Sequence, residues 1–163
     1  MTETTYKGSC LCGAPEIAVT GKPKVMGYCH CSTCRAWAAA PISAFTLWQP
    51  NSVKVTKGEE NIGSFQFTER SQRKFCRKCS GRIMTAHPQM KLTEVGAAVL
   101  PEFAFRPGLH VFYGEKVMSM HDGLPKFADV PKEAGGSGKA LPEYQEHARM
   151  FPFYEQRARE ILQ

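Results

Sequence analysis

Long hydrophobic runs are missing from this 163-residue sequence, and none approaches the length of a membrane-spanning helix. Residues 1–6 are polar and contain no apolar core of a signal peptide. We therefore expect a cytoplasmic protein with no membrane partner, in a reducing compartment where disulfides are disfavoured. A strong excess of charge is also missing, because the formal net charge is only +6. Charge alone thus gives no reason to expect a nucleic-acid partner.

Cysteine, in contrast, is plentiful, with seven in the chain. An odd number argues against a complete disulfide framework, and a disulfide within a Cys-x-Cys sequence would be strained. Close cysteine pairs in a reducing compartment are more typical of metal sites. The cysteines fall into three close groups: Cys10 and Cys12; Cys29, Cys31 and Cys34; Cys76 and Cys79.

The two outer pairs predict a structural zinc site. A structural zinc takes four sulfur or nitrogen ligands in a closed tetrahedron, and Cys10, Cys12, Cys76 and Cys79 supply four sulfurs. Glycines flank the first pair, where the chain needs tight turns around a bound ion. An ion held in this way would link the N-terminal strand to the middle of the chain. The alternative is that these cysteines are small buried apolar residues.

The central group, Cys29, Cys31 and Cys34, predicts a second zinc with an open position. Three protein ligands and one vacancy are the arrangement of a catalytic zinc, and a sulfur-rich site suits zinc and one further sulfur ligand. A thiol bound there loses its proton at neutral pH, which predicts capture of a small electrophile, such as an aldehyde, by a cofactor thiol. With seven thiolates and two zinc ions counted, the formal net charge falls to about +3.

The histidines are candidates for further roles. His30 would become a fourth ligand only if three adjacent residues turned toward one ion, and neighbouring side chains point apart in an extended chain. We therefore expect His30 on the solvent side or behind the ligands, where it is a candidate catalytic residue. His87, His110 and His121 are candidate acid–base groups, with a structural role as the alternative for each.

Cations also lie close to the cysteines in sequence. Arg35 follows the triplet, and Lys74, Arg77 and Lys78 surround the last pair. One interpretation is a solvated cationic face that partly offsets the thiolate charge. The other is that one of them, Arg35 in particular, binds a carboxylate of the thiol substrate.

Short alternating segments bounded by glycine, proline and asparagine predict a mainly β domain over residues 1–131. The alanines at 38–40 allow one helical turn, which Pro41 ends. Gly114-Glu115 predicts a hairpin turn before a last strand. Strands are expected over residues 16–20, 25–28, 42–48, 53–57, 62–67, 82–85, 94–100, 109–113 and 116–120.

The composition changes near residue 131. Residues 132–140 include Gly135-Gly136-Ser137-Gly138 and predict a flexible linker. Residues 141–163 predict a C-terminal helical extension with apolar residues along one face. That face packs either on the parent domain, or over the site as a lid, or on a second subunit, which leaves a homodimer as one alternative.

Four segments of the sequence carry a resemblance to a known family. They are Gly8-Ser9-Cys10-Leu11-Cys12-Gly13, Tyr28-Cys29-His30-Cys31-Ser32-Thr33-Cys34-Arg35, Phe75-Cys76-Arg77-Lys78-Cys79, and His110-Val111-Phe112 through Asp122-Gly123-Leu124-Pro125-Lys126-Phe127. Together they resemble the glutathione-dependent formaldehyde-activating enzyme family, which includes the centromere protein V domain. Ser80 replaces the glycine that is usual after Cys79, which leaves a turn shifted by one residue to Gly81 as an expectation. Residues 118–120 lack the tryptophan common in the family, and the tail from about residue 133 lies outside the resemblance.

The resemblance implies an Mss4-like zinc-binding β-sandwich (β-tent) with the same division of the cysteines into a structural and a catalytic zinc site. It implies condensation of glutathione, as co-substrate, with formaldehyde to S-hydroxymethylglutathione, classed as a carbon–sulfur lyase reaction in reverse. One alternative is a non-catalytic zinc module that binds glutathione, a protein partner or nucleic acid. Another is a glutathione or metal carrier without turnover.

Overall fold

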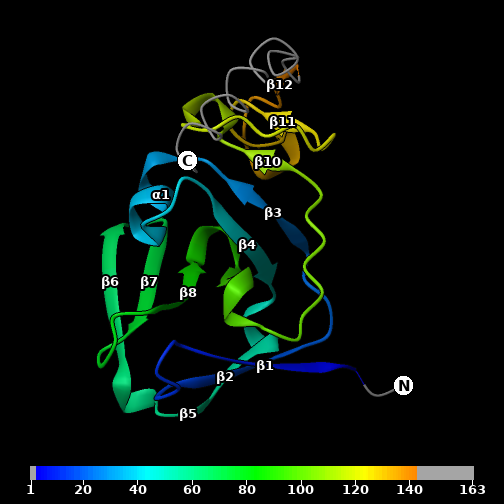
Figure 1. Ribbon diagram of the computed structural model, residues 1–163. Coiled ribbons are helices and arrows are strands. Elements are labelled where there is room, and N and C mark those ends of the chain that lie inside the picture. Colours follow the sequence, from blue (N-terminus) through cyan, green and yellow to red (C-terminus); the bar gives the residue numbers. More distant parts are fainter. Residues whose placement is uncertain (1–2, 143–163) are drawn as a thin grey trace, which may run out of the picture.

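The computed structural model describes residues 3–142, which form two β-sheets, one α-helix and several 3-10 helices (Figure 1). The predicted mainly β fold is therefore confirmed. Within the described residues, no helix is long and apolar enough to cross a membrane. The predicted helical extension over residues 141–163, with any dimer contact through it, lies outside the described residues from position 143 onward.

The two sheets differ in size. The smaller is antiparallel, with the order β1-β2-β5, and comprises β1 (Thr5–Ser9), β2 (Glu16–Thr20) and β5 (Val53–Lys57). The larger has the order β12-β11-β10-β3-β4-β9-β8-β7-β6. In Figure 1 the smaller sheet lies at the bottom, while β10, β11 and β12 lie at the top. The strands of the larger sheet are β3 (Val25–Cys29), β4 (Ser43–Trp48), β6 (Ile62–Thr68), β7 (Ser71–Cys76), β8 (Arg82–His87), β9 (Leu92–Gly96), β10 (His110–Val111), β11 (Lys126–Phe127) and β12 (Ala140–Leu141).

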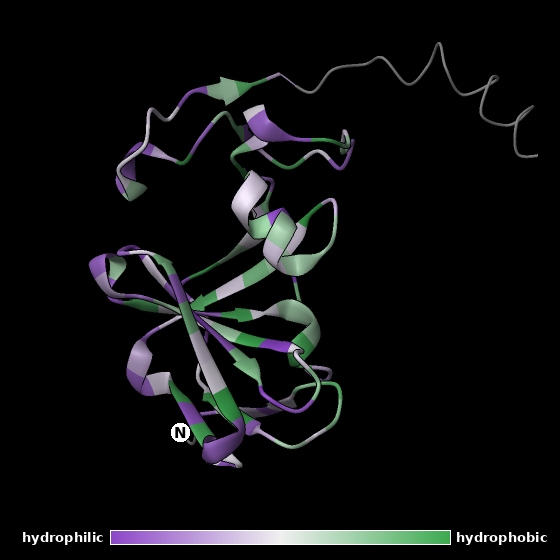
Figure 2. Ribbon diagram, turned by 90° about the vertical axis from the view of Figure 1, so that its left-hand side faces the viewer, coloured by the Kyte–Doolittle hydropathy of each residue, from purple (hydrophilic) through white to green (hydrophobic). Residues whose placement is uncertain are grey.

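Strand β4 separates two apolar clusters, because successive side chains of a strand point to opposite faces. Trp48 is fully buried and packs with Ile17 and Val19 of β2 in the core between the sheets. Phe45 and Leu47 belong to a second cluster, which also contains Cys29. The colouring in Figure 2 shows hydrophobic and hydrophilic segments following one another along the strands. The second cluster forms the floor of the candidate site.

Helix α1 (Ser32–Ala38) begins inside the cysteine triplet, before the helical turn predicted at residues 38–40. The Cys31 Sγ atom accepts a hydrogen bond from the backbone N–H of Cys34, at 3.3 Å, and so caps the helix. Trp37 then packs edge-on against Phe75 of β7, with ring centroids 6.3 Å apart. These two contacts fix the start of α1 beside the end of β3.

The hairpin predicted at Gly114-Glu115 is wrong. Those residues belong to the 3-10 helix η5 (Tyr113–Glu115), and residues 116–120 form no strand. The physical reason lies in Tyr113, whose hydroxyl accepts a 2.7 Å hydrogen bond from the backbone N–H of Met120. The segment therefore folds back over the Tyr113 side chain and does not pair with a neighbouring strand.

Residues 132–140 contain regular structure, although their composition predicts a linker. They begin with the 3-10 helix η6 (Lys132–Ala134) and lead into β12, which pairs with β11. Asp129 accepts a 2.8 Å hydrogen bond from the Ser137 hydroxyl. These contacts hold η6 against the rest of the domain, where it forms one wall of the candidate site. The expected strand over residues 94–100 is also shorter, because the chain turns into the 3-10 helix η4 (Ala97–Val99) after Gly96.

Candidate metal centres and active-site cavity

The structure brings the two outer cysteine pairs together. Cys10 and Cys12 follow β1, Cys76 ends β7 and Cys79 follows in the next turn. Their four sulfur atoms all lie within 4.8 Å of one another. The Cys12 Sγ atom lies 3.5 Å from that of Cys10 and 3.7 Å from that of Cys76. Tetrahedral zinc with Zn–S bonds of about 2.3 Å requires sulfur atoms about 3.8 Å apart. The donor set therefore fits a closed tetrahedral metal site.

The turn after Cys76 presents its sulfurs through backbone geometry. Ser80 adopts the left-handed conformation, with φ 58°, and its N–H donates to the Cys76 carbonyl oxygen at 2.8 Å. The departure from glycine at this position therefore does not move the turn to Gly81. Hydrogen bonds from the backbone, first of Gly81 and then of Cys12, lower the pKa of the Cys79 thiol to about 6. A thiol that ionises this readily is a good metal ligand.

The triplet forms a second, smaller cluster. Cys29 ends β3, Cys31 caps α1 and Cys34 lies in its first turn, and the three sulfur atoms lie within 4.8 Å of one another. Hydrogen bonds from Cys29 and then from Cys34 lower the pKa of the Cys31 thiol to about 2, and the bond with Cys31 raises the pKa of Cys29. Negative charge is thus concentrated where three sulfurs meet, which fits a metal ion held by three protein ligands.

His30 is buried behind the triplet and does not join the three sulfurs. Its side chain is fully inaccessible to solvent, which rules out the expected position on the solvent side. The Nε2 atom of His30 lies 2.9 Å from Nδ1 of His110, and Nε2 of His110 lies 2.8 Å from Oδ2 of Asp122. Lys126 donates to Oδ1 of Asp122 at 2.9 Å. Among the described residues, the His30 Nδ1 atom is the buried side-chain polar atom without a hydrogen-bond partner.

This buried chain of polar groups has a defined charge pattern. Burial, and then the neighbouring charge of His110, lowers the pKa of His30 to about 4. Burial raises the pKa of the Asp122 carboxyl, but hydrogen bonds from Lys126 and His110 outweigh it and lower that pKa to about 2. His30 is therefore neutral near pH 7, while Asp122 is ionised and balances the buried Lys126.

Arg35 holds backbone groups together behind the site. Its Nε donates to the His30 carbonyl oxygen at 2.9 Å, and one terminal nitrogen donates to the Glu115 carbonyl oxygen at 3.2 Å. The Glu115 carboxylate in turn accepts from the backbone N–H of Ser32 at 2.8 Å. Arg35 thereby ties α1 to η5, and it does not line the cavity described next.

A cavity of about 640 Å³ opens at the triplet, and all three of its cysteines line the wall. Apolar side chains of the second cluster, such as Phe45, Leu47 and Val111, cover most of the remaining surface. Phe112 lines the cavity with a left-handed backbone, φ 53°, a conformation that is rare for a bulky residue. Its N–H donates to the Asp129 carbonyl oxygen at 2.6 Å, which helps to hold the strained position.

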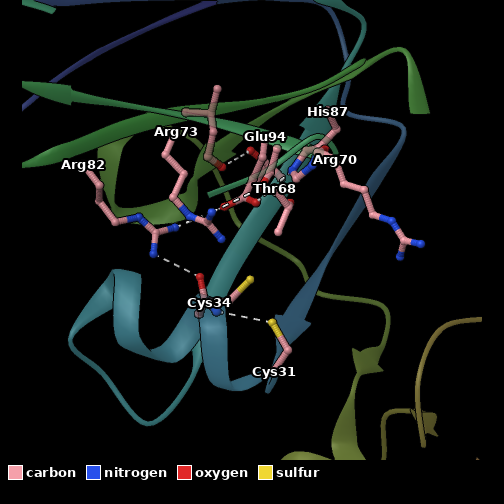
Figure 3. Close-up of polar contacts among 12 residues, drawn as sticks. Cys31, Cys34, Thr68, Arg70, Arg73, Arg82, His87 and Glu94 are labelled. Carbon is pink, nitrogen blue, oxygen red and sulfur yellow. Dashed lines mark hydrogen bonds and ion pairs between the residues drawn. The ribbon is translucent and has the colours of Figure 1, made fainter. Parts of the chain in front are cut away.

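One polar cluster also faces this cavity. His87 Nε2 lies 3.3 Å from Oε2 of Glu94, whose other oxygen lies 3.2 Å from a terminal nitrogen of Arg82. Arg82 also donates to the Ser43 hydroxyl at 3.0 Å. Figure 3 shows Arg82, Glu94 and His87 above the start of α1, beside which Cys31 and Cys34 lie. Of these, His87 and Glu94 line the cavity.

Sequence reasoning therefore found the cysteines but missed several groups around them. Of the three histidines proposed as acid–base groups, His87 lines the cavity, whereas His110 is buried behind it and His121 is exposed. Glu94 was missed, because a single acidic residue in an alternating strand resembles a solvated side chain. Glu94 lies diagonally across from His87 only because of the β8–β9 register, so the sequence carries no signal for this pair.

The chain is similar in sequence to known proteins. The sequence model of the glutathione-dependent formaldehyde-activating enzyme family matches residues 5–115. An uncharacterized lyase of Schizosaccharomyces pombe is 36% identical over 87 residues, which are 53% of this chain and 61% of that protein. The match thus spans less than two thirds of that relative. A Rhodobacter sphaeroides protein of known crystal structure is 29% identical, with a TM-score of 0.49 over 60% of this chain and 90% of that one.

Proposed function

Because the chain belongs to the glutathione-dependent formaldehyde-activating enzyme family, we propose that it is a zinc-dependent carbon–sulfur lyase acting on the adduct of glutathione and a small aldehyde. The family match includes all seven cysteines. The observation that carries the proposal is their division into a cluster of four sulfurs and a cluster of three, with the cluster of three opening into a cavity. A site that serves stability alone needs no such opening.

The two clusters take different roles in this proposal. Cys10, Cys12, Cys76 and Cys79 hold a structural zinc, and Cys29, Cys31 and Cys34 hold the catalytic one. A zinc ion held by Cys29, Cys31 and Cys34 would keep one position open and would favour ionisation of a glutathione thiol near neutral pH. The cavity then admits the aldehyde beside that position, and its apolar walls exclude water from the reacting atoms.

The reaction adds the thiol across the carbonyl group of the aldehyde. A carbon–sulfur bond forms as the S–H bond breaks, and the proton ends on the former carbonyl oxygen. The His87–Glu94 pair, which lines the cavity, carries this proton. Arg82 holds the Glu94 carboxylate from the other side and fixes its orientation. The reverse reaction uses the same groups to release the aldehyde. His30 lies behind the ligands and helps to hold in place the backbone that carries Cys29 and Cys31.

Exchange spectroscopy tests the proposal. Glutathione and formaldehyde combine spontaneously, so the rate of exchange between free glutathione and S-hydroxymethylglutathione is measured by NMR with and without the full chain. We expect two zinc ions per chain and an exchange rate that rises in proportion to protein concentration. Two bound zinc ions without any acceleration would contradict the proposal and favour a binding module or carrier.

A further inference from the structure

The cavity is much larger than formaldehyde needs. Formaldehyde has no carbon substituent, whereas a volume of about 640 Å³ falls in the range of pockets that enclose whole small molecules. The cavity begins at the three sulfurs and is lined by the neighbouring strands β4 and β9 of the larger sheet and by η6. Most of its volume is therefore available to something other than the reacting carbon and oxygen.

The walls are chemically suited to an apolar group. Leu47 of β4, Leu92 of β9 and Leu109 before β10 contribute side chains to the lining, and Val130 closes it from the C-terminal side. These residues belong to the second apolar cluster, with Phe112 packed against them. A hydrocarbon chain in contact with these walls leaves water at a gain of about 0.8 kcal/mol per methylene, which corresponds to about fourfold in affinity.

The charged groups in the lining argue against an anionic occupant. Among residues 3–142, Glu94 and Glu133 are its acidic residues, and no lysine or arginine of this part of the chain lines the cavity. Glutathione carries two carboxylates, which would be repelled by these side chains and would lack cationic partners on the walls. The charged part of the thiol therefore lies outside the cavity, with its sulfur alone reaching the triplet. The other substrate, the aldehyde, is left to fill the apolar space.

Hydrogen bonds within the chain hold together the cavity wall that contains η6. Val130 accepts a hydrogen bond from the Gly138 N–H at 3.2 Å, and the Ser137 hydroxyl donates to Asp129 at 2.8 Å. Both contacts close residues 129–138 into a compact loop that presents Val130 and Ala134 to the cavity. This part of the chain lies beyond the family match, which ends at residue 115, so the wall is formed by residues outside the matched region.

We propose that the cavity binds the apolar substituent of an aldehyde, so that the preferred substrate is an aldehyde with a chain of several carbons in place of formaldehyde. This inference rests on the proposed function and names its substrate class. The chemistry is unchanged: the thiol sulfur bonds to the carbonyl carbon, and the thiol proton passes to the oxygen. Selectivity comes from burial of the chain against the leucine and valine side chains.

A homologous series tests the inference with glutathione as the thiol. Formaldehyde, propanal, pentanal and heptanal are compared by the same exchange method, each relative to its spontaneous rate. We expect catalytic efficiency to rise about threefold to fivefold per added methylene until the cavity is full. A flat or falling series, with formaldehyde accelerated, overturns this inference and leaves the proposed function intact. No acceleration with any aldehyde overturns the proposed function itself.

Two alanine-to-phenylalanine variants test whether the selectivity for longer aldehydes arises in the cavity. Ala134→Phe places a ring in the cavity at an exposed position of η6, where the fold tolerates a larger side chain. We expect the ratio of heptanal to formaldehyde efficiency to fall at least about tenfold. In an apolar pocket, a difference of a single methylene changes catalytic efficiency by about that factor or more. Ala98→Phe makes the same change at an exposed alanine outside the cavity and should leave the ratio unchanged. Equal ratios in both variants overturn the inference.

Discussion

The Sγ atom of Cys12 lies 3.7 Å from that of Cys76, although 64 positions separate the two residues in the chain. This contact joins the loop after β1 in the smaller sheet to the turn after β7 in the larger one. The triplet differs, because it joins only the end of β3 to the first turn of the next helix. A metal ion in the first cluster would link distant segments, whereas one in the second would close a local loop. The two clusters should therefore respond differently to mutation.

Loss of the first cluster should unfold the protein. In Cys79→Ala the site retains three ligands, and a structural zinc contributes folding free energy on the order of 10 kcal/mol. We expect the variant to lose cooperative thermal unfolding, or to melt far below the wild type, as followed by circular dichroism. A strong chelator should bring the wild type to the same state. A Cys79→Ala protein that keeps the wild-type melting temperature would show that this cluster does not hold a structural metal.

The strained backbone at Ser80 predicts a stabilising substitution. Its φ of 58° is a conformation that costs a side-chain-bearing residue about 1 kcal/mol or more and costs glycine little. Ser80→Gly should raise the free energy of unfolding in denaturant titrations by about 1 kcal/mol. Ser80→Ala is the matched control, because alanine keeps the strain, and it should bring no gain. Equal stability of all three proteins would mean that the turn relaxes without strain.

The Asp122–Lys126 pair predicts a pH dependence of stability. Hydrogen bonds lower the pKa of Asp122 from 3.8 to about 2, so the ionised form stabilises the fold by about 2 kcal/mol. Because the folded-state pKa is depressed, this stability is complete above pH 3.8 and is lost as the pH falls through about 2.

Comparison of the wild type with Asp122→Asn isolates the contribution of the Asp122 charge to the free energy of unfolding. Both proteins are unfolded with denaturant at each pH in the same concentration of zinc, so that loss of metal at low pH affects them equally. We expect the wild type to exceed the variant in free energy of unfolding at pH 5 and the difference to shrink toward zero near pH 2. A difference that stays constant over this range would assign the effect of Asp122 to packing and not to its charge.

The His87–Glu94 pair predicts a loss of rate without a loss of metal. His87→Gln removes the proton carrier, and general acid–base groups contribute at least about 100-fold to catalysed rates. We expect catalysed exchange between glutathione and its aldehyde adduct to fall by about that factor while zinc content stays unchanged. His121→Gln makes the same change at an exposed histidine outside the cavity and should keep the wild-type rate. Similar rates for both variants would remove His87 from the mechanism.

The grouping of the cysteines was predictable because cysteine spacing is a local property. Two close pairs and one triplet divide the seven cysteines most simply into one site with four ligands and one with three. The structure brings together those same groups. Most strands were predictable for the same reason, since alternation along segments such as 53–57 does not depend on distant residues.

The cavity was not predictable, because it depends on pairings between distant segments. Glu94 meets His87 only through the register of β8 with β9, which no local pattern reveals. The composition of residues 132–140 is that of a linker, yet the pairing of β12 with β11 and the Asp129–Ser137 contacts fold this segment into a wall. The hairpin at Gly114-Glu115 was predicted wrongly for the same reason, since the fold of that segment depends on the Tyr113 hydroxyl.

The exchange rate of glutathione with formaldehyde in Cys34→Ala tests the central claim most directly, because this variant removes one ligand of the open site and leaves the cluster of four sulfurs complete. We predict that Cys34→Ala folds, melts close to the wild type, binds one zinc ion and exchanges glutathione at the spontaneous rate, while the wild type accelerates it. A folded Cys34→Ala protein that accelerates exchange as well as the wild type would contradict the assignment of catalysis to the triplet.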